Sequence, residues 1–465
     1  MIDIFSLPAE IIQRICEHLS IEDVLALSDS SNKLSECINQ KAFWLRRLSK
    51  GSNSQYSCIP DKRVNWRDVC IARDIIESWF EEDSNSVVNK QCHLYSCYCI
   101  DALKILKFPH QHLSVVGDRG GTLSLIALKD YLSQDEPHPL CTNNQAHSGW
   151  IWSIACDNDV IATTSWDHGL RVWSICESGF DMISQYSMTS SVLCSDFLKP
   201  NLVAVGTMNK EIKIFDYRVP TTTTTAAAFS NTFHTSTVLC LKSPYTITSG
   251  SLSDGSLFNS SSSLDFSDAN SLTSNMGDVC LNDTPEPTST DIPPPSQNVA
   301  FYSGGKDGIL AAWDLRNFNQ PLARYKFRSY PRKISLMDNE EMWVAESNRL
   351  HVFRTFLSRS TDRSPVFMHL KSHKYSSSLG AISSLEATPG GVFVTLGSRH
   401  LDAIYPTMPV RSMLKESLRN STSSNIYISL SYAQETLLAG GDNGTISVFM
   451  SKRRANQLQE SGSSA

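Results

Sequence analysis

The chain has 465 residues, of which 41% are hydrophobic and 19% charged, a length that suits about two or three globular domains. No apolar run reaches the length of roughly 18 residues that a membrane-spanning helix needs, and the acidic start MIDIF argues against a secretory signal peptide. The formal net charge of −6 gives no electrostatic reason to expect nucleic-acid binding. We therefore expect a multidomain protein of the cytoplasm or nucleus that has no membrane contact.

Cysteine usage supports that compartment. The 13 cysteines are scattered along the chain, and none forms a C-x-x-C pair. Free thiols in a reducing compartment explain this distribution better than a disulfide framework or a metal centre does. We accordingly expect no metal and no cofactor.

Residues 5–48 combine several short helical signals. Pro8, after Leu7, suits the first turn of a helix because its ring presets φ and it needs no amide donor. Ser20, with Asp23 three residues later, indicates a second helix start of the capping-box type. Between them, four apolar residues recur on one helical stripe: Ile11, Ile12, Ile15 and Leu19. Because so small a module buries little surface alone, this stripe predicts a partner.

The same segment resembles an F-box. The parts of the family pattern occur in order as Leu7-Pro8-Ala9-Glu10, Glu22-Asp23, Val24 to Leu27, and Phe43-Trp44. The Arg-containing signature common in the third helix is absent, and Ser30 to Leu34 stand in its place. The alternative is a helical subdomain whose apolar side chains fill only its own core. The resemblance implies an F-box at 3–48 that binds a Skp-type adaptor through Leu7, Pro8, Glu10, Ile11, Ile12, Ile15, Leu19, Val24, Leu25 and Trp44.

Beyond the F-box segment, the spacing of apolar residues is first that of a helix and then that of short strands. Residues 61–83 are predicted to form a linker helix, since their apolar residues have helical spacing: Trp66, Val69, Ile71, Ala72, Ile75, Ile76 and Trp79. From about residue 90 onward, short strands replace the helical signal.

The clearest strand unit runs from His147 to Trp173, and it resembles a WD repeat. The resemblance implies that Asp167 accepts a hydrogen bond from His147, which is linked to the Trp173 indole through Thr163 or Ser165. A hydrolase triad is the alternative explanation of these residue types. The WD interpretation is favoured because the chain offers no G-x-S-x-G elbow for the nucleophile.

The unit recurs, with its last strand marked by Ile126, Trp173, Phe215, Trp313, Phe353, Tyr405 and Phe449. One interval, of 98 residues, is too long, and the Ser- and Pro-rich stretch 247–298 explains it as a disordered insertion. Removing those 52 residues leaves an ordinary repeat of 46. An eighth blade built from Tyr245 to Phe258 is the competing count. It is disfavoured because Phe258 follows Asp254 by four residues, whereas Trp313 follows Asp307 by six.

The predicted architecture is mainly β: a seven-bladed WD-repeat propeller at 88–450, preceded by the F-box and linker helix. Residues 88–97 are expected to supply the outermost strand of the last blade, which closes the ring and removes its edges. A disordered tail is predicted at 452–465. The fourth unit keeps His234, Asp307 and Trp313. The blades are predicted near 98–130, 147–176, 188–218, 234–316, 325–357, 369–407 and 424–450.

The WD resemblance also implies two ligand-facing positions in each blade, one just before the turn Asp and one five residues after the opening His. With neighbouring positions, these are Trp150, Trp152, Trp166, Leu193, Met208, Leu239, Lys306 and Arg332. The set is aromatic and apolar rather than rich in the Arg forks that bind phosphate, so we expect a peptide anchored by an apolar or aromatic side chain. The alternative is that one or two tryptophans, Trp152 foremost, belong to blade packing.

Together the two modules resemble the F-box/WD-repeat family. The resemblance implies a substrate receptor of an SCF-type cullin–RING ubiquitin ligase. The F-box would bind the adaptor and, through it, the cullin–RING scaffold, while the propeller would hold an unknown protein substrate near the ubiquitin-loaded enzyme. No residue of this chain would be catalytic. A WD-repeat scaffold without a ligase role is one alternative, and an enzymatic propeller with carboxylates, histidines or metal ligands in its channel is the other.

Overall fold

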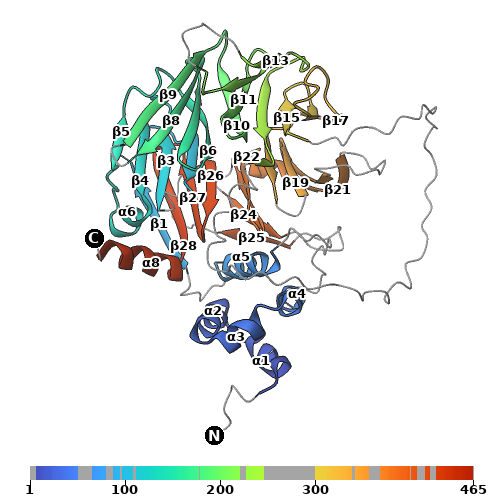
Figure 1. Cartoon of the computed structure of the whole chain (residues 1–465). Coiled ribbons are helices and arrows are strands. Elements are labelled where there is room, and N and C mark those ends of the chain that lie inside the picture. Colours follow the sequence, from blue (N-terminus) through green and yellow to red (C-terminus); the bar gives the residue numbers. More distant parts are fainter. Residues whose placement is uncertain are drawn as a thin grey trace, which may run out of the picture.

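The computed structural model describes residues 7–50, 65–79, 87–94, 97–107, 112–176, 179–219, 227–245, 299–337, 341–355, 367–397, 400–405, 414–418 and 426–463. Within these ranges an N-terminal helical region precedes seven four-stranded antiparallel sheets arranged as a β-propeller (Figure 1). The predicted insertion at 247–298 lies outside the described residues.

Four helices form the N-terminal module below the propeller (Figure 1). They are α1 (Ala9–Cys16), α2 (Ile21–Ser30), α3 (Asn32–Ile38) and α4 (Lys41–Lys50). Pro8 stands at the N-cap of α1, where a missing amide donor costs nothing. The Ser20 hydroxyl accepts a hydrogen bond from the Asp23 amide at the start of α2, as expected from the sequence. The helices enclose a core that includes Ile38 and Phe43.

Helix α5 (Trp66–Ser78) joins this module to the propeller. On the propeller side, Trp79 stacks on Phe393 of the sixth blade with ring centroids 5.8 Å apart. On the F-box side, the buried Arg73 guanidinium donates to the Leu48 carbonyl. Gly390 leaves room for the α5 backbone, since a Cβ there would lie 2.3 Å from the Arg73 amide nitrogen. One continuous apolar cluster thus runs from the helical module through α5 into the propeller.

Each blade is a meander of four strands, and neighbouring blades contact through their first strands. Blade one contains β2 (Ala102–Ile105), β3 (Leu113–Gly117), β4 (Leu123–Ala127) and β5 (Cys141–Asn143), and blade two contains β6 (Ile151–Asp157), β7 (Val160–Ser165), β8 (Gly169–Cys176) and β9 (Gly179–Ser187). Blade three contains β10 (Val192–Lys199), β11 (Leu202–Thr207), β12 (Ile212–Asp216) and β13 (Phe229–Asn231). Blade four contains β14 (Val238–Lys242), β15 (Phe301–Gly305), β16 (Ile309–Trp313) and β17 (Ala323–Lys326). Blades five and six contain β18 (Lys333–Leu336), β19 (Glu341–Glu346), β20 (Arg349–Thr355) and β21 (Phe367–Lys374); and, after the short η2 turn (Ser377–Leu379), β22 (Ile382–Ala387), β23 (Val392–Leu396), β24 (Leu401–Tyr405) and β25 (Leu414–Leu418).

The seventh blade joins the two ends of the propeller sequence. Strands β26 (Tyr427–Ala433), β27 (Thr436–Gly441) and β28 (Thr445–Ser451) are completed by β1 (Val87–His93). Strand β1 pairs antiparallel with β28, from Val87 opposite Ser451 to His93 opposite Thr445. This is the closing strand predicted at 88–97, and it covers the edge that β28 would otherwise expose.

Two details differ from the sequence-based boundaries. Strands β17 and β21 are the outer strands of blades four and five, although the ranges 325–357 and 369–407 assigned parts of them to the following blades. The tail predicted to be disordered at 452–465 contains α8 (Lys452–Ser463). That prediction was wrong there because Ala455 and Leu458, three residues apart on one helix face, are buried, and α8 packs against α6 (Leu128–Ser133).

Candidate functional site

In the second blade, four buried side chains form one hydrogen-bonded chain. Asp167 accepts from Nδ1 of His147 at 3.0 Å, and Nε2 of His147 lies 2.8 Å from the Thr163 hydroxyl. The Trp173 indole donates to the same hydroxyl oxygen at 2.9 Å. The sequence left Thr163 and Ser165 open as the linking residue, and the geometry selects Thr163. Ser165 instead donates to the Gly149 carbonyl.

The electrostatics of Asp167 follow from this chain. Burial alone would raise the pKa of its carboxyl group, but the hydrogen bonds that it accepts from His147 and from the Ser148 and Gly169 amides hold the pKa well below its usual range. Because the carboxylate is ionised and only accepts, His147 carries its proton on Nδ1. Nε2 then accepts from Thr163, and every member of the chain is satisfied.

The fourth blade repeats the arrangement. His234 Nδ1 lies 3.0 Å from Asp307, and its Nε2 lies 2.8 Å from the Ser303 hydroxyl, to which the Trp313 indole donates at 2.8 Å. Ser303 was missed in the sequence because the long 247–298 stretch separates it from His234. The signal was its spacing: it precedes Trp313 by ten residues, as Thr163 precedes Trp173.

These two networks fix the turns that carry the predicted ligand-facing residues. Trp166 and Lys306 come immediately before the two turn carboxylates, and both side chains are exposed. Backbone hydrogen bonds hold both positions, since the Trp166 amide donates to the Trp150 carbonyl and the Lys306 amide to the Thr237 carbonyl. The structure therefore places both residues at matching points of the propeller rim.

Three tryptophans gather at this rim. Trp150 and Trp152 are parallel with centroids 5.9 Å apart, and Trp166 lies 5.5 Å from Trp150 and 5.8 Å from Trp152. Trp150 and Trp152 are half-buried, whereas Trp166 is 41% exposed. Trp152 thus takes part in packing, and Trp166 offers the most accessible ring of the three.

Arg119 and Asp101 support the tryptophan cluster, and sequence reasoning missed both. The Arg119 guanidinium lies 4.3 Å from the Trp150 ring centroid, within the range of a cation–π contact. Two of its nitrogens donate to Asp101 at 2.7 and 3.2 Å. Strand pairing makes Gly117 of blade one equivalent to Thr164 of blade two. Because Arg119 follows Gly117 by two residues, as Trp166 follows Thr164, Arg119 occupies in blade one the rim position that Trp166 occupies in blade two. Gly120 replaces the turn Asp in this blade and hid the equivalence.

The remaining predicted rim residues divide by burial. Met208 is exposed, while Leu239 and Arg332 are half-buried. Leu193 is only 6% exposed, so this conformation offers little of its side chain to a ligand, and its predicted ligand contact stays a prediction. The Thr237 hydroxyl donates to the Met208 carbonyl, which ties the rims of blades three and four together.

The predicted adaptor-docking set also divides. Ile12, Val24, Leu25 and Trp44 are buried in the core of the helical module, so in this structure they support the module from inside, and their predicted docking on the adaptor stays a prediction. The helical period explains the division, since Ile12 and Cys16 turn inward while Ile11 and Ile15, four residues apart, turn outward.

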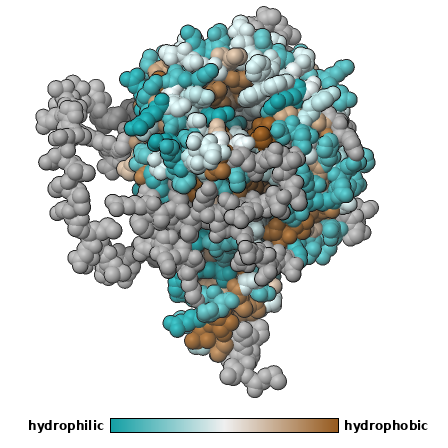
Figure 2. All heavy atoms as spheres, turned by 180° about the vertical axis from the view of Figure 1, so that it is seen from behind, coloured by the Kyte–Doolittle hydropathy of each residue, from teal (hydrophilic) through white to brown (hydrophobic). Residues whose placement is uncertain are grey.

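The outward face of α1 remains apolar. Ile11 and Ile15 are 43% and 41% exposed, and Pro8 and Glu10 beside them are also exposed. Leu7 and Leu19 are half-buried against the core. Figure 2 shows hydrophobic surface on this module at the foot of the molecule.

The described ranges hold neither a candidate metal centre nor a helix that could span a membrane. They contain no group of three or more His, Cys, Asp or Glu side chains arranged to hold a metal ion, and the 11 cysteines in them form no disulfide with one another. Burial raises the pKa of several thiols, to about 11 for Cys92, which keeps them protonated and unreactive. No helix in the described part is long and apolar enough to cross a membrane.

The helical module and the propeller define the class of protein. Residues 4–46 match the family model of the F-box domain, so the chain carries an F-box domain followed by a seven-bladed β-propeller.

Curated relatives combine the same two modules in their names. The chain is 26% identical over 220 residues to F-box/WD repeat-containing protein 9 of Homo sapiens, which covers 46% of this chain and 47% of that protein. The identity is also 26% over 247 residues to F-box/WD repeat-containing protein 9 of Bos taurus, covering 51% of each. F-box/WD repeat-containing protein mec-15 of Caenorhabditis elegans is 21% identical over 233 residues, covering 46% of this chain and 55% of that protein. The chain spans about half the length of the curated relatives it matches.

Proposed function

We propose that this protein is the substrate-recognition subunit of an SCF-type cullin–RING ubiquitin ligase, acting in the cytoplasm or nucleus. The observation that carries the proposal is one chain with two separate candidate binding surfaces. One is the exposed apolar face of α1 on an F-box domain, and the other is the tryptophan cluster on the propeller rim. A receptor needs one surface for the ligase and one for its substrate.

The α1 face suits a Skp-type adaptor. Ile11 and Ile15 lie four residues apart, so they form one ridge with Pro8 at its end. Burying a fully exposed Ile side chain contributes about 1.5–3 kcal/mol, and Ile11 and Ile15, at 43% and 41% exposed, would each contribute less than about half of that. The four buried residues Ile12, Val24, Leu25 and Trp44 keep the helices in place behind that ridge. Through the adaptor, the chain would reach the cullin–RING scaffold.

The rim suits a protein substrate with an apolar or aromatic anchor. Trp166 and Met208 are exposed on adjacent blades, and the arginine nearest the tryptophans, Arg119, already donates to Asp101 through two nitrogens. Since aromatic side chains dominate binding energy in many interfaces, Trp166 is the residue most suited to anchor a peptide.

The mechanism is proximity rather than chemistry in this chain. Helix α5 packs on both the F-box and the sixth blade, so a substrate on the rim would be held at a fixed distance from the adaptor. A fixed distance raises the local concentration of substrate lysines at the thioester carried by another subunit.

Co-purification of the adaptor tests the proposal. We expect the wild-type chain to capture a Skp-type adaptor and a cullin, and Ile11→Asp with Ile15→Asp to abolish capture, since two carboxylates would be buried without partners. Ile12→Val is the matched control on the inner face of the same helix, and it should retain capture. Undiminished capture by the double variant, or none by the wild type, would contradict the receptor role.

A further inference from the structure

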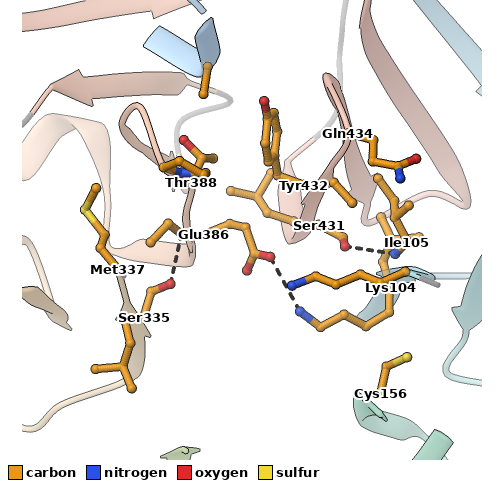
Figure 3. Close-up of a pocket in the computed structure, with 18 of the residues that line it drawn as sticks. Lys104, Ile105, Cys156, Ser335, Met337, Glu386, Thr388, Ser431, Tyr432 and Gln434 are labelled. Carbon is orange, nitrogen blue, oxygen red and sulfur yellow. Dashed lines mark hydrogen bonds and ion pairs between the residues drawn. The ribbon is translucent and has the colours of Figure 1, made fainter. Parts of the chain in front are cut away.

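The central channel of the propeller contains a cavity of about 740 Å³. Residues of the first strands of all seven blades line it, and α5 lines its lower end. Figure 3 shows Lys104 and Glu386 directed toward each other across this cavity, with Cys156, Ser335 and Ser431 around them. The cavity reaches the proposed substrate rim at Asp101 and Trp152, whereas Lys104 and Glu386 lie further along their first strands.

Strand register places one residue of each blade in a common layer of the channel. The first strand of each blade pairs with the second strand, and equivalent positions of the seven second strands are Gly117, Thr164, Gly206, Gly304, Ala345, Thr395 and Gly440. The residue of the common layer follows the first-strand partner of that position by two residues. We call these seven residues the channel layer. Its members are Lys104, Ala155, Asp196, Lys242, Ser335, Glu386 and Ser431.

Three members of the channel layer accept hydrogen bonds from the backbone of a neighbouring blade. Asp196 accepts from the Ser243 amide at 2.8 Å, Ser335 accepts from the Ala387 amide at 2.8 Å, and Ser431 accepts from the Ile105 amide at 2.9 Å. Each bond runs to the next blade around the ring. These side chains therefore join neighbouring blades, and their polarity is explained without a ligand.

The lysines of the layer are not explained in that way. Lys104 faces Glu386 at 3.5 Å, and Lys242 faces Asp196 at 3.4 Å. Lys107, three residues beyond Lys104, lines the same cavity. Among the described residues, it has no carboxylate within ion-pair distance.

The charge balance of the channel layer together with Lys107 is positive. Three ammonium groups meet two carboxylates, and Asp196 also accepts from the Phe197 and Ser243 amides. Lys107 is exposed at the wall of the cavity, and its partial desolvation there, followed by the positive charges of Lys104 and Lys242, lowers its pKa. Such mutual repulsion among the lysines would be relieved by an anion placed between them.

We propose that this cavity binds a small polyphosphate-type anion between Lys104, Lys107 and Lys242. Lysine holds phosphate as a point charge without demanding a fixed fork geometry. The volume lies within the range of small-molecule sites, about 300–1,000 Å³. Helix α5 covers the lower end, which favours a small soluble anion over a segment of another macromolecule.

Isothermal titration of the full-length chain with sodium tripolyphosphate tests this site. We expect saturable binding that weakens with added salt. In Lys107→Ala the affinity for tripolyphosphate should be lower than in the wild type by a factor of about ten or more. Lys129→Ala, which removes an exposed lysine of α6 outside the cavity, is the matched control and should bind like the wild type. Lys107→Arg keeps the charge and should retain most of the affinity.

Three results would overturn the site: no saturable heat with the wild-type chain, equal affinity in Lys107→Ala, or equal losses in Lys107→Ala and Lys129→Ala. Circular dichroism of each variant separates loss of the site from loss of the fold. Adaptor capture by the same Lys107→Ala sample should be unchanged, so failure here is distinguishable from failure of the receptor role.

Discussion

Thr163 and Thr164 provide a matched test of the WD hydrogen-bond chain. Both side chains are fully buried on β7, but only Thr163 bonds His147 and Trp173. Among the described residues, the Thr164 hydroxyl has no hydrogen-bond partner. Replacing Thr by Val removes the hydroxyl and keeps the shape, so the two variants differ only in the partners they leave behind.

The expected magnitudes follow from those partners. Thr163→Val leaves a buried indole N–H and a buried imidazole nitrogen unpaired, at about 1–3 kcal/mol each, so we expect destabilisation by about 2–6 kcal/mol. Thr164→Val buries a methyl group in place of an unpaired hydroxyl, and we expect it to be neutral or to stabilise by about 1 kcal/mol.

Urea denaturation followed by tryptophan fluorescence measures the difference. The Thr163→Val midpoint should fall by about 1 M or more relative to Thr164→Val. If the two variants unfold within about 0.5 kcal/mol of each other, the hydrogen-bond chain does not stabilise the blade and the reasoning is refuted.

Three further predictions concern the rim, acid stability and the linker helix. Trp166→Ala should weaken substrate capture at least about tenfold and leave adaptor capture unchanged. The control Met182→Ala, at an exposed position of the outer strand β9, should affect neither activity. Equal loss of both activities in Trp166→Ala would mean that the ring supports folding. The folded-state pKa of Asp167 lies below its ordinary value of 3.8, so the stability that its carboxylate contributes is present above that pH and is lost as the pH falls further. Urea midpoints measured from pH 6 to pH 2.5 should therefore drop more steeply below pH 4 for the wild type than for Asp167→Asn. Parallel curves for the two proteins would contradict this. Gly390→Ala should loosen α5 from the propeller and speed its proteolysis, since the new Cβ meets the helix backbone at 2.3 Å, while Gly397→Ala, whose nearest such contact is 3.7 Å, should not; equal cleavage rates would rule out this packing role.

The repeat network could be predicted because its residues carry a spacing that survives in sequence. Trp173 and Trp313 each follow their turn Asp by six residues, and such a constraint comes from one blade alone. The closing strand β1 was also predictable, because the last repeat lacks an outer strand of its own and the stretch before the first blade was unassigned.

Other features depend on contacts that no local pattern encodes. Ile11, Ile12 and Ile15 are equally apolar, so only the packed core decides that Ile12 turns inward. Helix α8 is polar over most of its length, and its order comes from Ala455 and Leu458 meeting α6. The channel layer required the exact register of seven first strands, including the bulges that interrupt their pairing.

The position of α5 links the two proposed surfaces physically. An F-box on a flexible tether would let the substrate sample a wide volume, which dilutes its lysines around the thioester. Here Trp79 stacks on Phe393 and Arg73 bonds the Leu48 carbonyl at the end of the F-box core. Both contacts are buried, so loosening either end of α5 would expose apolar surface as well as break a specific bond. In the proposed receptor, rigid presentation of the substrate would therefore depend on the same core that folds the F-box, and weakening that core should reduce ubiquitin transfer before it reduces substrate binding.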